Sequence, residues 1–376
     1  MELAPFPCGR LPGFRRAISL HPSGCVLLCA GKYTDDAAGT RPRVRSAILW
    51  CVSATDIDPE IRLDTFMAGF GGDGRKRLLM IVNPHASTVS DRLRNLVVSA
   101  LRGAYEVDAV DTERRDHATE LCREAAGEGY DAVVAFGGDG TVNEAANGLV
   151  GTTTPLMCLP GGRANVYCRM LGIPADVVDA TEHLLSLADG WRPHAVDLGR
   201  VGNRHFLFSA GVGLDANVVE RVDAHPRLKS RLGQYYYAWV ASLTYSRRYL
   251  VHPPRMTTSL GVDGVTVLIQ NAAPYTYWGS RAVEMASGAS LTSGDMAGLI
   301  LKRTSPLDIP SIAWRALSSH ARVSAHRQVH EFSGERRIMI SSLDGRELAV
   351  QVDGDYIGSA TEHEFTVVPG GLTVVA

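Results

Sequence analysis

The segment FGGDGTVNEAANG, residues 136–148, combines residue types that suit phosphate binding. Its three glycines accept positive φ and let a ligand approach the backbone without interference from a Cβ atom. Thr141 and Glu144 match the S/T-x-x-E capping box, which predicts that a helix starts at Thr141. Backbone N–H groups and the positive end of the helix dipole favour a phosphate at such a start.

A carboxylate, Asp139, lies within the same loop. Since like charges repel, this residue is a poor direct partner for phosphate unless a divalent cation or a proton-transfer step lies between them. The loop therefore predicts a nucleotide phosphate bound together with Mg²⁺. An Asp-Gly pair is also a common hairpin turn, but helical rather than alternating residues follow Asp139-Gly140, which disfavours that interpretation.

Two familiar phosphate loops are excluded. The glycines lack the GxGxxG register of dinucleotide folds, and the chain has no GxxxxGK[ST] segment, because Gly31-Lys32 is followed by Tyr33. The segment is a phosphate loop of another kind.

The elements around the loop alternate between strand-like and helical patterns. Strand-like apolar runs occupy 78–82, 105–112, 131–136 and 155–160, and helical spacing occupies 89–103, 117–129 and 141–150. This alternation predicts a three-layer α/β domain with a parallel sheet covered on both faces. Ligands of such sheets bind beyond the carboxyl ends of the strands.

After about residue 192 the pattern changes. Strand-like runs are joined at Gly202-Asn203, Asp263-Gly264 and Asp344-Gly345, and such pairs predict hairpins. We therefore expect a mainly antiparallel β-sandwich domain, with helical inserts at 228–250 and 309–323. The last strand-like residues are a candidate strand of the first domain.

Composition narrows the class of protein. The 376 residues suffice for about two to three domains, and 45% hydrophobic residues with a net charge of -2 indicate a globular chain without the basic excess of a nucleic-acid binder. Seven cysteines without a CxxC pair imply neither a disulfide framework nor a zinc site, so a reducing cytosol is the simplest setting. No apolar run approaches the roughly 18 residues of a membrane span, and the first residues lack a signal-peptide core.

Residues 1–66 carry turn-formers and charges without a sustained period, and we interpret them as an N-terminal extension of uncertain order. Met67 opens the stretch that leads into the first regular strand, which makes it a candidate translation start. N-terminal sequencing of native protein would contradict this by finding residues upstream of Met67.

Three ordered motifs carry a resemblance: NPHAS at 83–87, GGDGTVNEAANGL at 137–149 and LPGGRANVYCRMLGIP at 159–174. Together they resemble the diacylglycerol kinase catalytic family, which includes bacterial lipid kinases and the sphingosine and ceramide kinases. The second motif alone is shared in part with NAD kinases and 6-phosphofructokinases. The resemblance continues in DLG, AGVGLDA, KSRLGQYYY and VDGD, and covers roughly residues 77–376.

The resemblance implies a two-domain lipid kinase with the active cleft between the domains. Residues 77–192 would form the ATP-binding domain and residues 193–376 the β-sandwich lipid-binding domain. The implied reaction moves the γ-phosphoryl group of Mg²⁺-bound ATP to the hydroxyl of diacylglycerol or a related lipid alcohol.

By matched position, several residues would contact the nucleotide, and Glu144 would brace their loop. These are Asn83, Ser87, Gly138, Asp139, Gly140 and Thr141, with Gly162, Ala164 and Asn165 lining the same cleft. Asn83 and Asn165 have an alternative role as cap or turn residues.

Two carboxylates are candidates for handling the acceptor proton. Asp139 lies at the phosphate loop and is also the candidate contact to ATP-bound Mg²⁺. Asp355 stands where the DGE motif of the family usually has a glutamate proposed as general base, and its shorter side chain withdraws the oxygens by about one methylene. The alternative for Asp353-Gly354-Asp355 is an ordinary hairpin turn.

Other matched positions carry charge. Arg163 replaces the threonine or serine of many members and is either a bidentate partner of an ATP phosphate or a solvated surface charge. Lys229, with Arg231, matches a basic position that would neutralise the transferring phosphoryl group. Asp215 is a candidate anchor for the polar part of the lipid.

A structural Mg²⁺ of some members is doubtful here, because Ser293 stands where the aspartate is expected and Asp295 lies two residues later. Aromatic residues crowd the segment 235–249, where core packing is the favoured role for most of them. Nearby arginines predict reversible attraction to anionic lipid, hence a cytoplasmic, peripherally membrane-associated protein. A homodimer is a candidate assembly.

Two alternatives stay open: a kinase for a soluble acceptor such as NAD, which shares the phosphate loop, and a catalytically weak lipid-binding regulatory protein, suggested by Asp355 and Arg163.

Overall fold

The computed structural model describes residues 75–376, apart from 189, 226–227, 229–230, 280 and 319–320. Within residues 14–52 it describes the strands alone. The chain divides into two compact units, residues 1–73 and 74–376. The first unit contains β1 (Phe14–Leu20), β2 (Val26–Thr34), β3 (Arg43–Val44) and β4 (Ile48–Val52), and β2 pairs antiparallel with the other three. The sequence did not predict this sheet, because its short apolar runs become strands only by pairing with one another.

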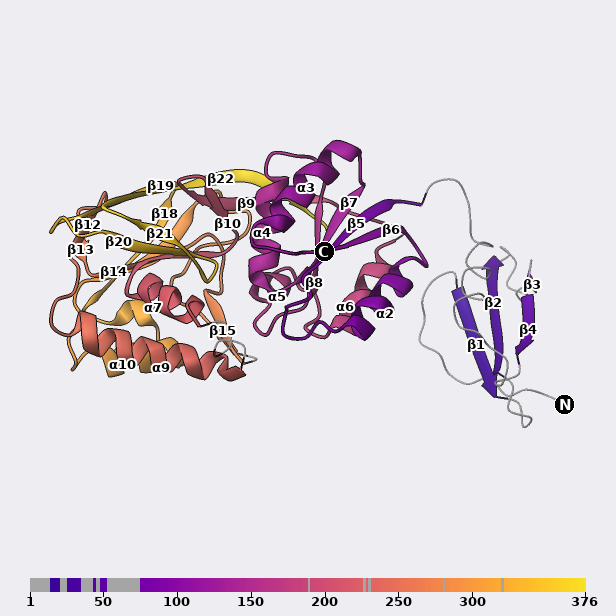
Figure 1. Cartoon of the computed structure of the whole chain (residues 1–376), viewed down its shortest axis with the longest axis horizontal. Coiled ribbons are helices and arrows are strands. Elements are labelled where there is room, and N and C mark those ends of the chain that lie inside the picture. Colours follow the sequence, from indigo (N-terminus) through magenta and orange to yellow (C-terminus); the bar gives the residue numbers. More distant parts are fainter. Residues whose placement is uncertain are drawn as a thin grey trace. The chain divides into compact units, whose positions relative to one another are not determined.

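The second unit begins with the predicted α/β pattern (Figure 1). Its strands are β5 (Arg77–Val82), β6 (Glu106–Asp111), β7 (Ala132–Gly137) and β8 (Leu156–Pro160), all parallel in the order β8-β7-β5-β6. Its helices are α2 (Asp91–Leu101), α3 (His117–Glu128), α4 (Asp139–Leu149), α5 (Val166–Met170) and α6 (Val177–Ser186). The expected three-layer α/β class is confirmed.

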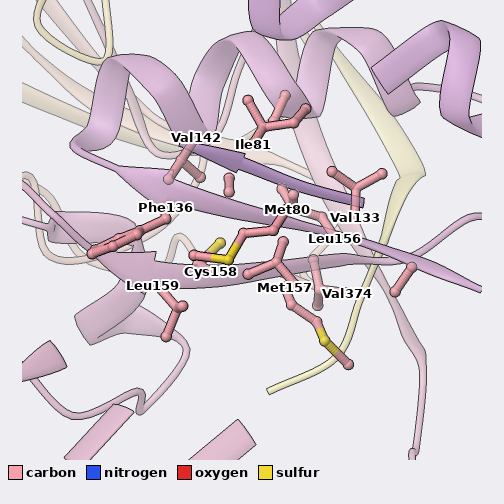
Figure 2. Close-up of a cluster of buried hydrophobic side chains, with 14 of the residues drawn as sticks. Met80, Ile81, Val133, Phe136, Val142, Leu156, Met157, Cys158, Leu159 and Val374 are labelled. Carbon is pink, nitrogen blue, oxygen red and sulfur yellow. The ribbon is translucent and has the colours of Figure 1, made fainter. Parts of the chain in front are cut away.

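The parallel strands are buried because helices cover both faces of the sheet. Helices α3 and α4 pack together on one face and α2 and α6 on the other (Figure 1). Every residue of β7 and β8 is buried, which explains their continuous apolar sequence. Figure 2 shows side chains of β5, β7, β8 and α4 packed together, with Val374 from the far end of the chain among them.

The antiparallel part comprises two packed sheets. One is formed by β9 (His194–Val201), β10 (Arg204–Phe206), β12 (Met256–Thr258), β13 (Asp263–Gly264), β19 (Arg337–Ser342) and β22 (Glu362–Val374). The other has the order β18-β17-β14-β11-β20-β21, with β11 (Ser209–Gly213), β14 (Thr266–Gln270), β17 (Met296–Leu301), β18 (Val329–Glu335), β20 (Leu348–Val352) and β21 (Asp355–Ala360). Phe206, Ile269, Ile340 and Phe365 share the core between them, which gives the expected sandwich.

Strand β22 connects the two parts of the unit. It pairs antiparallel with β9 and β19, and its end at Val374 pairs in parallel with β8. The parallel sheet and one sheet of the sandwich are therefore a single ten-stranded sheet.

Two of the three predicted hairpins are wrong. Gly202-Asn203 does join β9 to β10. Asp263-Gly264 is a strand itself, β13, which pairs with β12. Asp344-Gly345 connects strands of different sheets, since β19 pairs with β12 and β22 whereas β20 pairs with β11 and β21.

The remaining elements lie on the sandwich. They are α7 (Leu214–Asp223), α9 (Gln234–Thr244) with a π-helical end (Tyr245–Tyr249), the hairpin β15 (Thr276–Trp278) and β16 (Arg281–Val283), α10 (Ile309–Leu317) and a short 3₁₀ helix (Val323–Ala325). Both predicted helical inserts are confirmed.

Candidate active site

The candidate site lies at the point where the strand order of the parallel sheet reverses. Strand β5 pairs with β6 on one side and with β7 on the other, so the crevice opens beyond the carboxyl ends of β5 and β7. Asn83, which follows β5, donates its N–H to the carbonyl of Phe136 in β7. Its side-chain amide donates to Thr141 Oγ1 at 2.9 Å. Asn83 thus fixes the β5 loop against the start of α4.

Close backbone packing explains Gly161 and Gly162 of the loop after β8, and positive φ does not explain the glycines of the phosphate loop. None of Gly137, Gly138 and Gly140 has a positive φ, so the predicted conformational reason is wrong. A Cβ on Gly162 would lie 2.8 Å from the Gly138 Cα, and one on Gly161 would lie 2.9 Å from the Gly137 Cα. The loops after β7 and β8 therefore touch main chain to main chain.

Helix α4 starts at Asp139, two residues before the predicted start. Its N-cap is Gly138, and no side chain caps this end, so the predicted capping box is not formed. The Glu144 carboxylate instead accepts N–H groups of Asp116 and Ala118 at the start of α3, and burial raises its pKa. Because Glu144 turns away, it does not cap the first N–H groups of α4, of which the Asp139 N–H lies beside its own carboxylate.

The loop after β8 closes on itself through Asn165. This residue has a φ of 44°, in the left-handed region that asparagine tolerates. Its side chain accepts from Gly162 N–H and donates to Gly162 C=O, each at 2.8 Å. Both polar ends of the Asn165 side chain are used within the turn. A nucleotide contact from this side chain stays a prediction.

Asp139 points from α4 to the start of α5. Its Oδ1 accepts the N–H of Tyr167 at 3.1 Å. Burial raises the pKa of the Asp139 carboxyl above its ordinary value, the N–H groups of Tyr167 and Val166 oppose this, and the charge of Asp355 raises it further. The fold therefore brings the two predicted catalytic carboxylates close together.

Asp355 reaches this place from the other part of the unit. It is the first residue of β21, and its Oδ2 lies 3.3 Å from the position of a Cβ on Gly140. The carboxylate therefore lies against the first turn of α4, although the side chain is a methylene shorter than glutamate.

Asp215 lies in a network beside the Asp355 turn. Its Oδ2 accepts from Tyr275 OH at 2.7 Å and from Gln351 Nε2 at 2.6 Å. Burial raises the pKa of Asp215, and these two hydrogen bonds oppose the shift. Gln351 Oε1 in turn accepts the Gly354 N–H, so Asp215 is connected to the residue before Asp355.

The other predicted residues have varied positions. Ser87 is exposed beside the crevice, and the neighbouring Thr88 donates its N–H to Gly161. Ala164 is half-buried. Arg163 is exposed, and its Nη1 lies 2.6 Å from the position of a Cβ on Gly233, at the start of α9. Lys229 lies outside the described residues, and Arg231 is exposed.

Sequence reasoning missed Asp353 and Asn143. The Asp353 carboxylate accepts N–H groups of Leu207, Phe208 and Ser209 and the Asn143 amide, at 2.7–3.1 Å. This buried group joins α4 to the segment between β10 and β11, and so aligns the two sides of the crevice. The available signal was an asparagine on the buried face of a helix, which requires a polar partner.

Titration of Asp353 is expected to lower the free energy of unfolding as the pH rises from about 4 to about 6. Burial raises the pKa of this carboxyl from 3.8 to about 6. Between these values the folded protein holds a proton that the unfolded chain has released, so stability falls with pH, by up to about 3 kcal/mol.

Urea denaturation of the wild type and Asp353→Asn at about pH 4.5 and about pH 7 measures this effect, because asparagine does not titrate there. The stability of the wild type relative to the variant should fall between the two pH values. A difference in stability between the two proteins that does not change with pH would contradict the raised pKa of Asp353.

The loop where a structural metal was considered doubtful is held by hydrogen bonds. Asp197 accepts the N–H groups of Gly294 and Gly370 at 2.7 and 2.8 Å, and Ser293 donates to the Ser290 carbonyl. Within the described part of the chain, no three His, Cys, Asp or Glu residues lie together as a metal site. Nor does that part contain a helix long and apolar enough to cross a bilayer.

A parallel sheet with glycine loops at its switch point meets an antiparallel sandwich that adds a second carboxylate, and comparison with known proteins identifies the class: the chain is a kinase. Residues 77–201 match the diacylglycerol kinase catalytic domain.

Relatives and solved structures are also similar to this chain. A diacylglycerol kinase of Staphylococcus aureus (strain bovine RF122 / ET3-1) is 27% identical over 293 residues, which are 76% of this chain and 87% of the relative. A solved structure from Bacillus anthracis str. Sterne has a TM-score of 0.64 and 24% identity. A second, of a diacylglycerol kinase from the same source, has a TM-score of 0.58 and 20% identity. Each covers 81% of this chain and 98% of its own, and shows a shared fold.

Proposed function

We propose that the protein transfers the γ-phosphoryl group of ATP to the hydroxyl of diacylglycerol or a related lipid alcohol. One observation carries this proposal: Asp139 and Asp355, from the two parts of the unit, meet at the uncapped start of α4. An uncapped helix start favours phosphate, and a carboxylate beside it suits an alcohol acceptor.

The nucleotide would lie across the loops after β5, β7 and β8. The α4 N–H groups would hold its phosphates, with Ser87 and Thr88 at the rim. Both Asp carboxylates are hard oxygen donors, and Mg²⁺ commonly takes one or two carboxylates with the remaining ligands from phosphates and water. The site thus fits Mg²⁺ carried by ATP, which would supply charge neutralisation for the triphosphate.

In the proposed reaction, Asp355 accepts the proton of the lipid hydroxyl while that oxygen attacks the γ-phosphorus. The bond between the γ-phosphorus and the bridging oxygen breaks, and ADP leaves with the electron pair. Asp139 keeps negative charge beside the transferring group and holds α5 through the Tyr167 N–H. Arg163 and Lys229 are candidates for neutralising the phosphoryl charge.

Asp215 has two candidate roles in this scheme. It would anchor the polar part of the lipid, as the resemblance implies. It would also position Asp355, because Gln351 connects it to Gly354. The second role is supported by the short contacts within this network.

Replacing Gly138 by alanine is expected to raise the KM for ATP by about tenfold or more with little loss of stability. Gly138 has a φ of −88°, and an added Cβ would meet only Gly162 Cα, at 3.5 Å, an ordinary contact. The methyl group would therefore obstruct an approaching phosphate rather than the protein. Steady-state kinetics and urea denaturation measure the two effects.

Gly127→Ala is the matched control, since Gly127 lies in α3 with nothing within 4 Å of an added Cβ. It should leave the KM for ATP unchanged. An unchanged KM in Gly138→Ala as well would place the phosphates elsewhere.

The acceptor is tested with purified protein, Mg²⁺, radiolabelled ATP and a panel of dispersed lipids together with NAD. Transfer of the radiolabel from ATP to phosphatidic acid supports the proposal. Transfer of the radiolabel to NADP supports the soluble-acceptor alternative. Nucleotide binding without transfer would favour a regulatory protein. A cytoplasmic location with reversible membrane contact belongs to the proposal, because the acceptor resides in a bilayer.

A further inference from the structure

Four large apolar side chains form an exposed aromatic face on the sandwich. Their exposed fractions are 47% for Leu232, 70% for Tyr235, 60% for Trp239 and 38% for Trp278. Residues 235 and 239 are four apart in α9, a spacing that places their side chains on one side of the helix, and Leu232 lies just before the Gly233 N-cap. Tyr235 meets Trp278 of β15 edge to face, with ring centroids 6.3 Å apart. We refer to these four residues as the aromatic face.

Core packing does not explain the aromatic face. The opposite side of α9 already packs in the protein, where Tyr236 and Val240 are 4% and 2% exposed against Val218 and Val222 of α7. Tyr235 and Trp239 lie beside these core residues in sequence, yet they point to solvent. Tyr235 and Trp239 are therefore exceptions to the core packing expected for most aromatics of this segment. Large contiguous apolar surface of this kind marks an interaction site.

The charges around the aromatic face favour an anionic lipid surface. The sequence contains no Asp or Glu between Asp223 and Asp263, whereas it contains several arginines there. Arg231 and Arg247 are exposed near the two ends of α9. Tyrosine and tryptophan combine an apolar ring with a polar group, which suits the boundary between headgroups and acyl chains.

The aromatic face is continuous with the candidate active site. Gly233, the N-cap of α9, lies against the Arg163 guanidinium, and Arg163 belongs to the loop after β8. On the sandwich side, Arg169 of α5 lies over the Tyr277 ring at 3.4 Å and donates to the Gly279 carbonyl. In Figure 1, β15 and one end of α9 lie toward α5, and the rest of α9 extends away from it along the sandwich. A surface bound here would bring its lipids to the mouth of the crevice.

We propose that the aromatic face inserts into the headgroup region of an anionic bilayer and docks the kinase on the membrane that holds its acceptor. This inference rests on the proposed function for its purpose, but the docking itself is measurable without catalysis. Leu232, Tyr235 and Trp239 supply apolar contact, and the arginines of the segment supply attraction that salt weakens.

The experiment measures binding of the full chain to vesicles of phosphatidylcholine with phosphatidylglycerol, by sedimentation. Tyr235→Ser/Trp239→Ser should weaken binding by about tenfold or more, since the transfer of apolar area provides much of the affinity. The matched control is Leu96→Ser/Val178→Ser, which removes two side chains of similar exposure, 50% and 51%, from α2 and α6. The control should bind like the wild type.

Kinase assays with a monomeric and a vesicle-embedded substrate distinguish a loss of membrane docking from a loss of folding or of catalysis. On dihexanoylglycerol below its aggregation concentration, Tyr235→Ser/Trp239→Ser should keep the wild-type rate, whereas on vesicle-embedded diacylglycerol it should be slower. Equal vesicle binding by the wild type and this variant would overturn the inference. The inference would also be overturned if Tyr235→Ser/Trp239→Ser changed only the oligomeric state of the protein. The aromatic face would then bind a second copy of the chain.

Failure of the proposed function gives a different result. If the wild type binds vesicles through the aromatic face but phosphorylates no lipid, docking stands and the reaction assignment fails. If the wild type phosphorylates lipid while loss of the aromatic face changes nothing, the reaction stands and docking fails.

Discussion

Asp139→Asn is expected to lower kcat by about 100- to 1000-fold or more while the protein remains folded. The side chain keeps its size, and its carbonyl oxygen can still accept the Tyr167 N–H. The negative charge beside the phosphates is lost, and with it the carboxylate that would contact a nucleotide-bound cation. Single-turnover kinetics with saturating Mg·ATP measures the effect.

The stability of this variant provides an independent check. Because burial raises the pKa of Asp139, the folded state disfavours its charge. At neutral pH the free energy of unfolding should therefore stay equal or rise, so lost activity cannot be attributed to unfolding. Asp91→Asn, an exposed change in the first turn of α2, is the control for activity and should leave kcat unchanged. Full activity in Asp139→Asn would refute its assigned role.

Asp355→Asn is expected to reduce kcat by about 100- to 10,000-fold with little change in the KM for ATP. A general base acts on the acceptor proton in the transition state, and an amide cannot accept that proton. Asp263→Asn, exposed in β13, is the matched control. A fall in ATP affinity with an unchanged kcat would assign Asp355 to nucleotide binding.

Asp355→Glu tests the departure from the family motif. The Asp355 oxygens already lie against the first turn of α4, with Oδ2 3.3 Å from the Cβ position on Gly140. An added methylene would displace them, and an error of about 1 Å can cost about 100-fold in rate. We therefore expect Asp355→Glu to be slower than the wild type. A faster variant would mean that the shorter side chain limits the natural rate.

Local sequence predicted the parts of the fold that depend on burial. The runs at 78–82 and 131–136 became β5 and β7 because strands covered on both faces require continuous apolar residues. The proximity of Asp139 and Asp355 followed from family resemblance, since nothing local to either residue indicates the other.

The failures came from partners distant in sequence. Glu144 fits a capping box, but the start of α3 binds its carboxylate. Asp344-Gly345 fits a hairpin turn, but the strands on its two sides pair with different sheets. The sequence around Asp353 is typical of a turn. The four hydrogen bonds of Asp353 could not be predicted, because they depend on the packing of the sandwich against α4.

The path of β22 has a consequence for synthesis on the ribosome. Its final residues cover the edge of β8, which otherwise presents unpaired N–H and C=O groups. The nucleotide-binding half, although made before β22, therefore keeps an open edge until β22 has left the exit tunnel. During that interval the nascent chain is vulnerable to mispairing with other strands.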